Sequence, residues 1–452
     1  MGCIREGAHV THPADLGLAE AACELRAGRL TSVELTQASL DRIAARDSNI
    51  CAFVHLAADA ALQAAEESDQ ALSEGRDAGP LHGIPFAIKD VFDVEGWPVR
   101  FGCAHYRDRI AAGTADAVAA LVSAGAIPLG LVATYELATV GPDTTSLYPQ
   151  PRNPWNAGRV TGGSSSGSAA AVSAGMVRFA LGSDTGGSAR SPAAYCGVVG
   201  FKPTAERLSK RGLMPLAPSM DQVGLIAASA ADASIVFAAL AGEAAAQAPV
   251  SGRIGFGRNW AMAEGSAGQI LALLDEAASA LSLIGHRIEI VEMPDYPSIE
   301  KAASDILLFE QIAARRSEVE HHFDHIGKMA WASLGAGLSI KPEQVVEARS
   351  LATDFTNEID ALLAGCHALI LPTTMDIAPS FADFKDGEAV WTAMRTIPFN
   401  LSGHPVLTVP IGFDKGLPLG MQIIGARGAD AQVLQIGAAF EAATDHSTSR
   451  PY

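Results

Sequence analysis

The stretch of sequence that decides the fold is VTGGSSSGSAAAVSAGMVRFALGSDTGGS, residues 160–188. It contains two clusters rich in glycine and serine, 162–168 and 182–188, and an apolar helical segment and an apolar strand lie between them. Glycine permits backbone conformations that are closed to other residues and lets amide groups point into a site, while hydroxyls supply nucleophiles and proton relays. We therefore expect the two clusters to converge at one chemical site.

Three interpretations compete for this stretch. A flexible Gly/Ser linker is disfavoured because an apolar helix and strand separate the two clusters. A phosphate cradle is disfavoured because the G-x-x-x-x-G-K-[ST] and G-x-G-x-x-G spacings are both absent and no lysine follows the loop. A serine hydrolase is the third interpretation, although the G-x-S-x-G elbow that would anchor a Ser-His-Asp order is missing.

A serine nucleophile needs a base, and Lys89 in GIPFAIKD (83–90) is the candidate. This lysine lies within a segment typical of a buried strand. Burial disfavours the charged ammonium group, so it lowers the pKa of a lysine toward neutrality and yields a usable base. The alternative is a lysine at the strand end that pairs with Asp90 or extends to water. Ser-Lys catalysis is a known variant of triad chemistry.

Outward from this centre, helical and strand patterns alternate. A capping box formed by Thr31 and Glu34 opens an amphipathic helix, and an Ala-rich helix ends at Gly75. The predicted helices are 31–47, 59–75, 115–124, 167–176, 267–283 and 430–444. The predicted strands are IPFAIKDVFDV (84–94), AIPLGLVAT (126–134), RFALGSD (178–184), VVGFKPT (198–204), GRIGFGRN (252–259), IEIVEM (288–293), HALILPTT (367–374), PVLTVPIGF (405–413) and LGMQIIG (419–425). This alternation predicts an α/β sheet that helices cover on both faces.

The chain shows no sign of division into separate units. Low-complexity linkers, charge blocks and repeats with periods of about 20–50 residues are all absent from the sequence. We therefore expect one domain over 1–452. A mostly helical, charge-richer segment at about 299–365 is predicted to be an insertion that covers one face of the sheet.

The overall composition excludes several classes of protein. Lys and Arg number 32 against 50 Asp and Glu, a net charge of −18, so a nucleic-acid-binding surface is not expected. The first ten residues lack a secretory signal pattern, and the apolar run 117–134 is too short and too interrupted to span a membrane. Six scattered cysteines predict reduced thiols, and hence a cytoplasmic protein. They are Cys3, Cys23, Cys51, Cys103, Cys196 and Cys366.

Taken together, several motifs resemble those of the amidase signature family, and the likeness runs from about Thr31 to the C-terminus. The matching motifs are GIPFAIKD (83–90), NPWN (153–156), GGSSSGSAAAVSAGM (162–176), LGSDTGGSARSPAAYCGVVGFKPT (181–204) and the late NLSGHPVLTVPIGF and GLPLGMQIIG within 400–425. The resemblance implies the amidase signature fold, a single α/β/α domain with a central twisted mixed β-sheet covered by helices. Its signature core would occupy about 80–210.

The resemblance also assigns roles at the site. It implies that Lys89 is the base, that Ser164, after a cis peptide bond, is the bridging serine, and that Ser188 is the nucleophile. The backbone amides that would form the oxyanion hole are those of Thr185, Gly186, Gly187 and Ser188. The residues that would support the triad by hydrogen bonds are Ser165, Asp184 and Arg190. The family's lysine base, when neutral, takes the proton of the bridging serine, which takes that of the nucleophile.

A substrate pocket is expected beside these groups. Its predicted members are Tyr135, Gly141, Ala189, Arg207, Ile397 and Gln422. The family usually has glycine where Ser166 stands, and a bulky apolar residue where Ala189 and Ser191 stand. The small Ala189 and Ser191 predict a roomy acyl site, and a mobile cover near Arg207 is a further hypothesis.

Other candidate groups favour structural roles. His321 and His325 have helical spacing, but the H-E-x-x-H pattern is absent, so we expect no metal. His82 is predicted to be a loop histidine and Cys196 a buried, unreactive thiol.

These observations predict an enzyme that hydrolyses the C–N bond of an amide, anilide or carbamate through an acyl-enzyme. Urethane cleavage is included, because some members of the family are urethanases. We expect a small-molecule substrate, no cofactor, no nucleic-acid or membrane partner, and a monomer or homodimer. The alternatives are the glutamine-hydrolysing subunit of an amidotransferase, a hydrolase of urea derivatives resembling carboxybiuret or allophanate, and a non-catalytic binding protein that keeps the fold.

Overall fold

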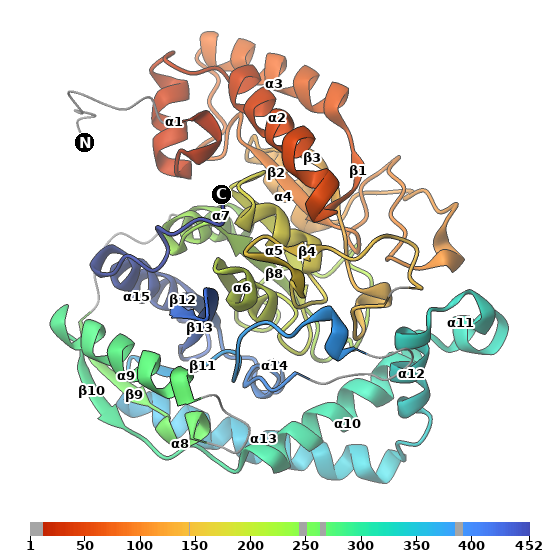
Figure 1. Cartoon of the computed structure of the whole chain (residues 1–452), viewed down its shortest axis with the longest axis vertical. Coiled ribbons are helices and arrows are strands. Elements are labelled where there is room, and N and C mark those ends of the chain that lie inside the picture. Colours follow the sequence, from red (N-terminus) through yellow and green to blue (C-terminus); the bar gives the residue numbers. More distant parts are fainter. Residues whose placement is uncertain (1–11, 144, 244–250, 263–267, 385–391) are drawn as a thin grey trace.

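A large mixed sheet organises the computed structural model, which describes residues 12–143, 145–243, 251–262, 268–384 and 392–452 (Figure 1). The strands of this sheet are β1 (Phe53–Leu56), β2 (Pro85–Lys89), β3 (Ile127–Val132), β6 (Phe179–Asp184), β7 (Val199–Lys202), β8 (Gln222–Ala227), β9 (Arg253–Phe256), β10 (Arg287–Ile290), β11 (Ala368–Pro372), β12 (Val406–Asp414) and β13 (Leu417–Ile424). A separate two-stranded ribbon consists of β4 (Arg152–Asn153) and β5 (Asn156–Val160).

The strands of the large sheet follow the order β1-β3-β2-β6-β8-β7-β12-β13-β11-β9-β10. β2 is parallel to both β3 and β6, and β9 is parallel to β10 and β11. The remaining neighbours in the sheet pair antiparallel. The sheet is therefore mixed, and β2 and β6, which carry Lys89 and Asp184 at their ends, are adjacent in it.

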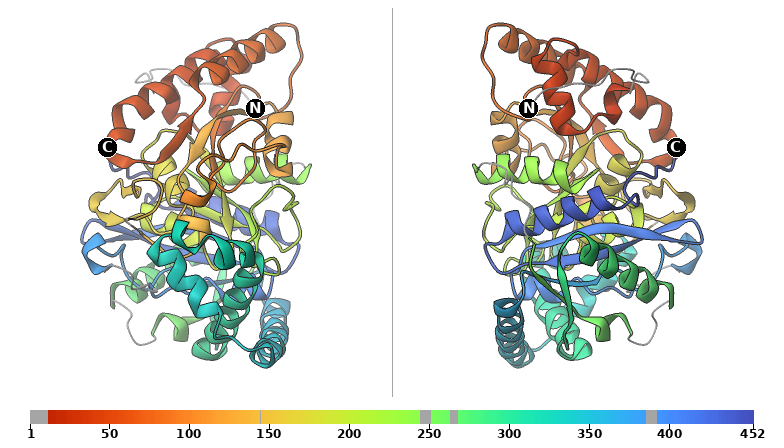
Figure 2. Two further views of the ribbon diagram at one scale, coloured as in Figure 1. Left: turned by 90° about the vertical axis from the view of Figure 1, so that its right-hand side faces the viewer. Right: turned by 90° about the vertical axis from the view of Figure 1, so that its left-hand side faces the viewer.

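Helices cover both faces of this sheet, as the two side views show (Figure 2). The helices are α1 (Leu18–Arg26), α2 (Ser32–Ile50), α3 (Ala58–Ser73), α4 (Asp116–Ser123), α5 (Ser166–Ser173), α6 (Arg190–Cys196), α7 (Ala230–Ala241), α8 (Arg258–Ala261), α9 (Gly268–Leu283), α10 (Tyr296–Ala314), α11 (Arg316–His321), α12 (Lys328–Gly337), α13 (Pro342–Gly365), α14 (Pro398–Leu401) and α15 (Asp430–Ala443). Successive residues of β2 enter different apolar clusters. Phe86 and Ile88 belong to the cluster that also contains residues of α1, α4 and α7, whereas Ala87 belongs to the cluster that contains residues of α2, α3, α5 and α6. This alternation is the period of two of a strand that is buried on both faces.

The segment between β10 and β11 is helical throughout most of its length. α10 and α13 bury apolar side chains against β11 and β13, where Leu369, Leu371 and Ile424 share one cluster with them. In Figure 1 these helices lie at the opposite end of the molecule from α1, α2 and α3. The predicted helical segment at 299–365 therefore packs on one side of the C-terminal strands.

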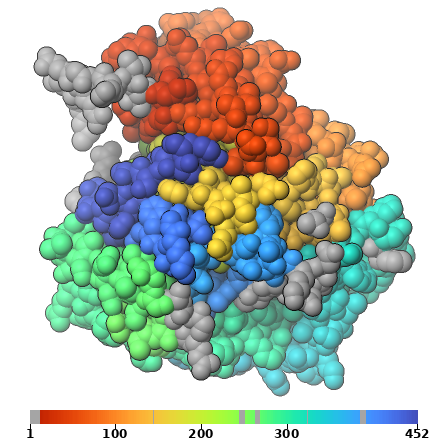
Figure 3. All heavy atoms as spheres, in the orientation of Figure 1, coloured from red at the N-terminus to blue at the C-terminus, as the bar shows by residue number. Residues whose placement is uncertain are grey.

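Segments distant in the sequence lie together on the surface. In Figure 3 the yellow segment near β4 and β5 lies against the light-blue segment that follows β11. A backbone bridge between Arg159 and Ser380 joins them.

Most predicted elements occur within a few residues of their expected bounds. The capping box of Thr31 and Glu34 is present, and it begins α2 at Ser32. Two buried elements of the centre were not predicted: β8, which lies between β6 and β7, and α6. Within the described residues, the helices are too short or too polar to cross a bilayer.

The expectation of reduced thiols is wrong for Cys23, which is disulfide-bonded. Cys51, Cys103, Cys196 and Cys366 are free thiols. Cys3 lies outside the described residues.

Candidate active site

Lys89 lies at the C-terminal end of β2 and is completely buried. Its Nζ is 2.8 Å from the hydroxyl oxygen of Ser164 and 2.8 Å from that of Ser183. Burial lowers the pKa of Lys89 to about 7, although the carboxylates of Asp184 and Asp221 act in the opposite direction. A lysine with this pKa is neutral in a large fraction of molecules at neutral pH and can accept a proton.

The loop before α5 holds Ser164 against Lys89. The peptide bond between Gly163 and Ser164 is cis, as the resemblance implied. The carbonyl oxygen of Ser164 accepts a hydrogen bond from the amide of Tyr135 at 3.0 Å. A Cβ at Gly163 would overlap the ring of Tyr135, so only glycine fits beside this ring. The ring and the serine loop therefore fix each other's position.

Ser188 lies on the loop between β6 and α6, close to the Ser164 loop. Its carbonyl oxygen accepts a hydrogen bond from the amide of Ser165 at 3.1 Å, so the two loops are joined one residue away from Ser164. The hydroxyl of Ser165 also donates to the carbonyl oxygen of Ser183 at 3.1 Å. The structure thus brings together the lysine, both serines and Ser165, all of which the sequence singled out.

A buried ion pair fixes the loop that carries Ser188. Asp184 and Arg190 are both fully buried, and their closest N–O distance is 2.8 Å. Burial alone would raise the pKa of Asp184, but the charge and hydrogen bonds of Arg190, together with Asn400, lower it to about 2. The five N–H donors of Arg190 are all used, and their acceptors are Asp184, Thr396, Asn400 and Gln422. Asp184 and Arg190 therefore lie where the sequence predicted supporting residues.

The amide groups of this loop divide into two sets. The carboxylate of Asp184 accepts hydrogen bonds from the amides of Gly187 at 3.0 Å, Ala189 at 3.1 Å and Arg190 at 3.3 Å. Gly187 is consequently a poor candidate for the oxyanion hole, contrary to the sequence prediction, because its N–H is already engaged. The amides of Thr185, Gly186 and Ser188 donate to no acceptor among the described residues, and all three residues line the pocket.

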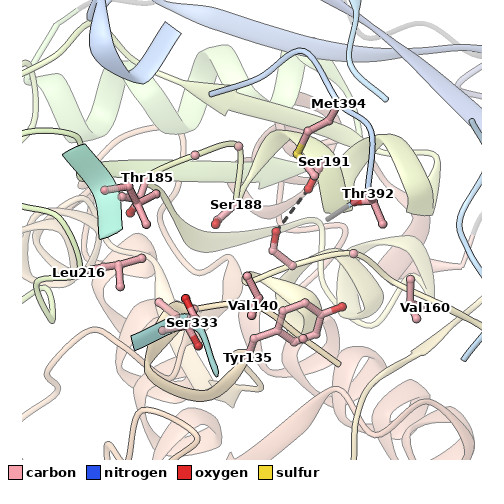
Figure 4. Close-up of a pocket in the computed structure, with 18 of the residues that line it drawn as sticks. Tyr135, Val140, Val160, Thr185, Ser188, Ser191, Leu216, Ser333, Thr392 and Met394 are labelled. Carbon is pink, nitrogen blue, oxygen red and sulfur yellow. Dashed lines mark hydrogen bonds between the residues drawn. The ribbon is translucent and has the colours of Figure 1, made fainter. Parts of the chain in front are cut away.

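The pocket above Ser188 has about 740 Å³ of empty space, including its open mouth (Figure 4). Tyr135 and Gly141, both predicted, are among its lining residues. Ser191 also lines it and donates from its hydroxyl to the carbonyl oxygen of Gly163 at 3.3 Å. The other side chains of the lining belong to Ala138, Thr139, Val140, Val160, Thr185, Tyr195, Leu216, Leu307, Gln311, Ser333, Phe384, Thr392 and Met394. Within the described part of the lining, every residue is uncharged.

Four predicted pocket residues lie elsewhere. Ala189 is fully buried beneath the loop, facing Gly182 and Gly224, so its small size serves the packing of α6 on the sheet rather than a roomier pocket. Gln422 is buried behind Arg190, where it accepts from Nη1 at 2.9 Å. Ile397 lies against Gly186, outside the lining.

Arg207 is the fourth of these residues. It lies at the surface, where it pairs with Glu243. Its charged side chain is held by this ion pair and does not border the pocket. The structure therefore gives no support to a substrate contact at Arg207.

Several residues of the site were not predicted. Ser183, Asn400 and Thr396 contact Lys89, Asp184 and Arg190 respectively. Ser183 could have been found, because strand alternation in RFALGSD and the adjacency of β6 to β2 direct it toward Lys89. Thr396 precedes α14 and Asn400 lies within it, both more than two hundred residues away, and no local pattern indicates them.

The remaining candidates have structural surroundings. Nδ1 of His82 accepts a hydrogen bond from the amide of Ala78 at 2.9 Å, and Nε2 is 3.1 Å from the carbonyl oxygen of Ser68. Both contacts lie away from the pocket. Burial raises the pKa of Cys196, whose thiol contacts the carbonyl of Thr161. Within the described part of the chain, no group of three or more His, Cys, Asp or Glu side chains, including those near His321 and His325, is arranged to hold a metal ion.

Comparisons with known proteins agree with this geometry. The sequence profile of the amidase family matches residues 34–434. The chain is 34% identical to a glutamyl-tRNA(Gln) amidotransferase subunit of Chloroflexus aurantiacus, over 96% of this chain and 98% of that one. A solved amidase structure superposes with a TM-score of 0.87 at 30% identity and covers 94% of this chain and 99% of its own. A bacterial aryl acylamidase of the amidase signature family superposes with a TM-score of 0.84 at 25% identity and covers 96% of this chain and 97% of its own.

The fold of these solved structures is the mixed sheet with flanking helices described above. The profile match covers most of the chain, including β2 with Lys89 and both Gly/Ser clusters. The chain therefore belongs to the amidase signature family and is a hydrolase of carbon–nitrogen bonds other than peptide bonds.

Proposed function

We propose that this chain hydrolyses an uncharged amide, anilide or carbamate through an acyl-enzyme on Ser188, with Ser164 as proton relay and Lys89 as base. The observation that carries the proposal is the 2.8 Å contact between the buried Lys89 Nζ and the Ser164 hydroxyl. The next residue, Ser165, donates its amide hydrogen bond to the carbonyl oxygen of Ser188, so this contact lies beside Ser188. In this surrounding the lysine has a pKa of about 7, which suits a general base at neutral pH.

The proton path follows from the contacts. Neutral Lys89 donates to Ser183 and accepts the hydroxyl proton of Ser164, which accepts the proton of Ser188 as its oxygen attacks the substrate carbonyl carbon. The reverse transfer delivers the proton to the leaving nitrogen as the C–N bond breaks, leaving an ester on Ser188. Water then attacks this ester, passes a proton to the same relay, and releases the acid and Ser188.

The free amides of Thr185, Gly186 and Ser188 are the proposed donors to the tetrahedral oxyanion. Each such donor contributes about 3–4 kcal/mol to transition-state stabilisation in acyl-transfer enzymes. The ion pair of Asp184 and Arg190 has a positioning role, because it fixes the loop without reaching the pocket.

The lining of the pocket supports an uncharged substrate. Its described side chains are apolar or neutral polar, with Leu216, Leu307 and Met394 among the apolar ones. A charged substrate group buried there would lose its hydration without gaining an opposite charge, and this costs several kcal/mol. Amides, anilides and carbamates present the same type of carbonyl to Ser188.

A second candidate, the glutamine-hydrolysing subunit of an amidotransferase, is favoured by the 34% identity to a subunit of glutamyl-tRNA(Gln) amidotransferase. Glutamine carries an ammonium and a carboxylate group, for which the described lining offers no charged partner. We therefore place this candidate second. Glutaminase activity that depends on a co-purifying protein would reverse the order.

The experiment is a hydrolysis screen of primary amides, anilides, aryl carbamates and glutamine with the wild-type protein and a Ser188→Ala variant. We expect turnover of at least one uncharged class, and a loss of at least about 10³-fold in kcat for Ser188→Ala. Ser402→Ala, which removes a buried hydroxyl bonded to His404 away from the pocket, is the matched control and should keep its activity. Turnover that is equal in wild type and Ser188→Ala would contradict the proposal.

A further inference from the structure

Among the polar side chains of the pocket lining that the proposed chemistry does not use are Gln311 of α10 and Ser333 of α12, which contact each other. Gln311 is fully buried and Ser333 is 7% exposed. Nε2 of Gln311 donates to the carbonyl oxygen of Ser333 at 2.7 Å and contacts its hydroxyl at 3.2 Å. The pair therefore joins two helices of the segment between β10 and β11 at the wall of the pocket.

The amide oxygen of Gln311 has no close hydrogen-bond donor among the described residues. The amide oxygen of Gln311 has the Ser333 hydroxyl at 3.4 Å as its contact among the described residues, whereas O–H···O bonds are normally about 2.5–3.0 Å long. A buried amide oxygen without a close donor is unfavourable. The serine hydroxyl, whose contacts to Gln311 are both long, can rotate toward the pocket. The pair can thus offer an acceptor and a hydroxyl donor to a bound molecule.

The position of this pair relative to the nucleophile follows from α10. Leu307 precedes Gln311 by one helical turn on the same face, and its Cδ1 would be 3.6 Å from a Cβ at Gly186. Four residues of an α-helix advance roughly 6 Å along its axis. Gln311 therefore lies about that distance along α10 from Leu307, the residue that faces Gly186. In the view of Figure 4, Ser188 lies between Ser333 and Thr392. Ser333 therefore lies on the other side of Ser188 from Thr392 in this view, and Gln311 contacts Ser333.

We propose that Gln311 and Ser333 determine substrate specificity by selecting amides that carry a second, non-reacting, uncharged hydrogen-bonding group, a hydroxyl or a secondary amide, several bonds from the scissile carbonyl. The proposal rests on the proposed function of Ser188. Leu216 and Leu307 line the same pocket, so we expect the connecting chain of the substrate to be apolar. Sites built to hydrogen-bond a substrate group discriminate strongly against analogues that lack it, because their buried polar atoms are then left unpaired.

The test uses two matched series of anilides, since the polar group could lie on either side of the scissile bond. The acyl series compares 6-hydroxyhexanoyl anilide with heptanoyl anilide, which has a methyl in place of the hydroxyl. The leaving-group series compares the acetanilides bearing para 3-hydroxypropyl and para butyl chains. Acetanilide itself, without a chain, reports the chemistry alone. The quantity measured is the ratio of kcat/KM for the hydroxyl and the methyl member of each series.

We expect the wild type to favour the hydroxyl member by about tenfold in at least one series. Ser333→Ala and Gln311→Leu should each reduce that ratio about three- to tenfold, and by more than they lower kcat/KM for acetanilide. Ser339→Ala, an exposed serine just after the same helix, is the matched control and should keep the wild-type ratio.

A wild type without preference in both series, or a preference unchanged in both variants, would overturn the role of Gln311 and Ser333 and leave the proposed function standing. Ser333→Ala keeps the result interpretable if Gln311→Leu does not fold. Wild-type protein that hydrolyses neither the anilides nor any other uncharged class of the screen, or a Ser188→Ala variant that hydrolyses acetanilide as fast as wild type, would instead count against the proposed function itself.

Discussion

Two buried lysines of the sheet show how surroundings decide the use of a residue. Lys89 and Lys202 are both fully buried, and burial lowers the pKa of each to about 7. Lys89 has two serine hydroxyls at 2.8 Å, whereas Lys202 donates to the carbonyl oxygen of Pro203 at 2.9 Å. Of these two lysines, only Lys89 can accept a proton from a neighbouring hydroxyl in the described structure. Lys202 is equally buried without such a hydroxyl, so a substitution of Lys202 is the matched control for a substitution of Lys89.

The pH dependence of activity should follow from Lys89. Because the base must be neutral, kcat/KM should fall about tenfold per pH unit below pH 7 and level off above it. Lys89→Met should lower kcat by at least about 10³-fold, and Lys202→Met should keep the acid limb near pH 7. A pH–rate profile of the three proteins is the measurement, and a flat profile between pH 5 and pH 8 in wild type would contradict the assignment of the base.

Lys89 should lower the stability of the folded protein, although the activity depends on it. Its folded pKa of about 7 lies below the unfolded value of about 10.4, so the unfolded state binds the proton more tightly. This destabilisation is complete below pH 7 and shrinks as the pH rises toward 10. Lys89→Met should therefore raise the free energy of unfolding by on the order of 2–4 kcal/mol at pH 6, and by less at pH 9. Urea unfolding at both pH values tests this, and a gain independent of pH would refute it.

At the scale of elements, the loop from β6 to α6 depends on a tight approach of its backbone. Gly187 has a φ of +121°, and a Cβ there would overlap the side chain of Thr396. The amide of Gly187 donates to Asp184, so the same residue also completes the carboxylate's set of backbone donors. Any side chain at this position must displace the loop that bears Ser188.

Gly187→Ala should abolish measurable hydrolysis, because it moves the nucleophile and the adjacent amides together. Gly416→Ala is the control: Gly416 also has a positive φ, +76°, but a Cβ there would meet no atom within 4 Å. The control should lose about 1–2 kcal/mol of stability from backbone strain alone and keep its kcat. Activity assays with thermal unfolding decide the matter, and a Gly187→Ala protein with near wild-type kcat would be inconsistent with this packing.

The start of α12 is held by two carboxylates. Glu136 accepts from the amide of Gly327 at 2.9 Å, and Asp143 accepts from the amide of Met329 at 2.8 Å. Burial, assisted by the nearby charge of Asp143, raises the pKa of Glu136 to about 7. Glu136 and Asp143 lie on either side of the segment 138–141, which lines the pocket. Their hydrogen bonds to the start of α12 therefore connect this part of the pocket wall to the helix that carries Ser333.

Asp143→Ala should cost about 1–2 kcal/mol of stability, as does the loss of other helix caps, and should raise KM more than it lowers kcat. Asp143→Asn retains an oxygen acceptor and should preserve most of the stability. Thermal unfolding and steady-state kinetics of the pair measure this. Equal behaviour of the Ala and Asn variants would show that the cap does not support the pocket.

At the scale of the whole molecule, the single large sheet brings distant segments to one site. Lys89 comes from β2, Ser164 from the loop before α5, and Ser188 from the loop after β6, whereas Asn400 and Gln422 come from the C-terminal third. The net charge of −18 disfavours a polyanionic partner such as tRNA. These features favour an enzyme whose site is complete within one chain.

The purified chain should therefore hydrolyse its substrate without a second protein. Light scattering should give the mass of one or two copies, and added cell extract should not raise kcat. A requirement for a distinct partner chain, with glutamine as the substrate, would support the amidotransferase alternative.

Site residues that lie in local sequence motifs could be predicted, whereas those contributed by distant segments could not. Lys89, Ser164 and Ser188 lie in local motifs whose chemistry is evident from residue type. Ala189 and Gln422 were misplaced because a motif does not reveal which face of a helix or strand borders the pocket. Gln311 and Ser333 were missed altogether, since helices more than a hundred residues beyond the motifs bring them to the site. Burial and long-range packing decide such positions.

The central claim, that Ser188 is the nucleophile, is tested most directly by the site of covalent modification. The wild-type protein would be treated with a fluorophosphonate probe, and the adduct located by mass spectrometry of its peptides. We predict a single adduct at Ser188, slow labelling in Lys89→Met, and no labelling in Ser188→Ala. An adduct at another residue, or wild-type protein that remains unlabelled while it turns over substrate, would contradict the account.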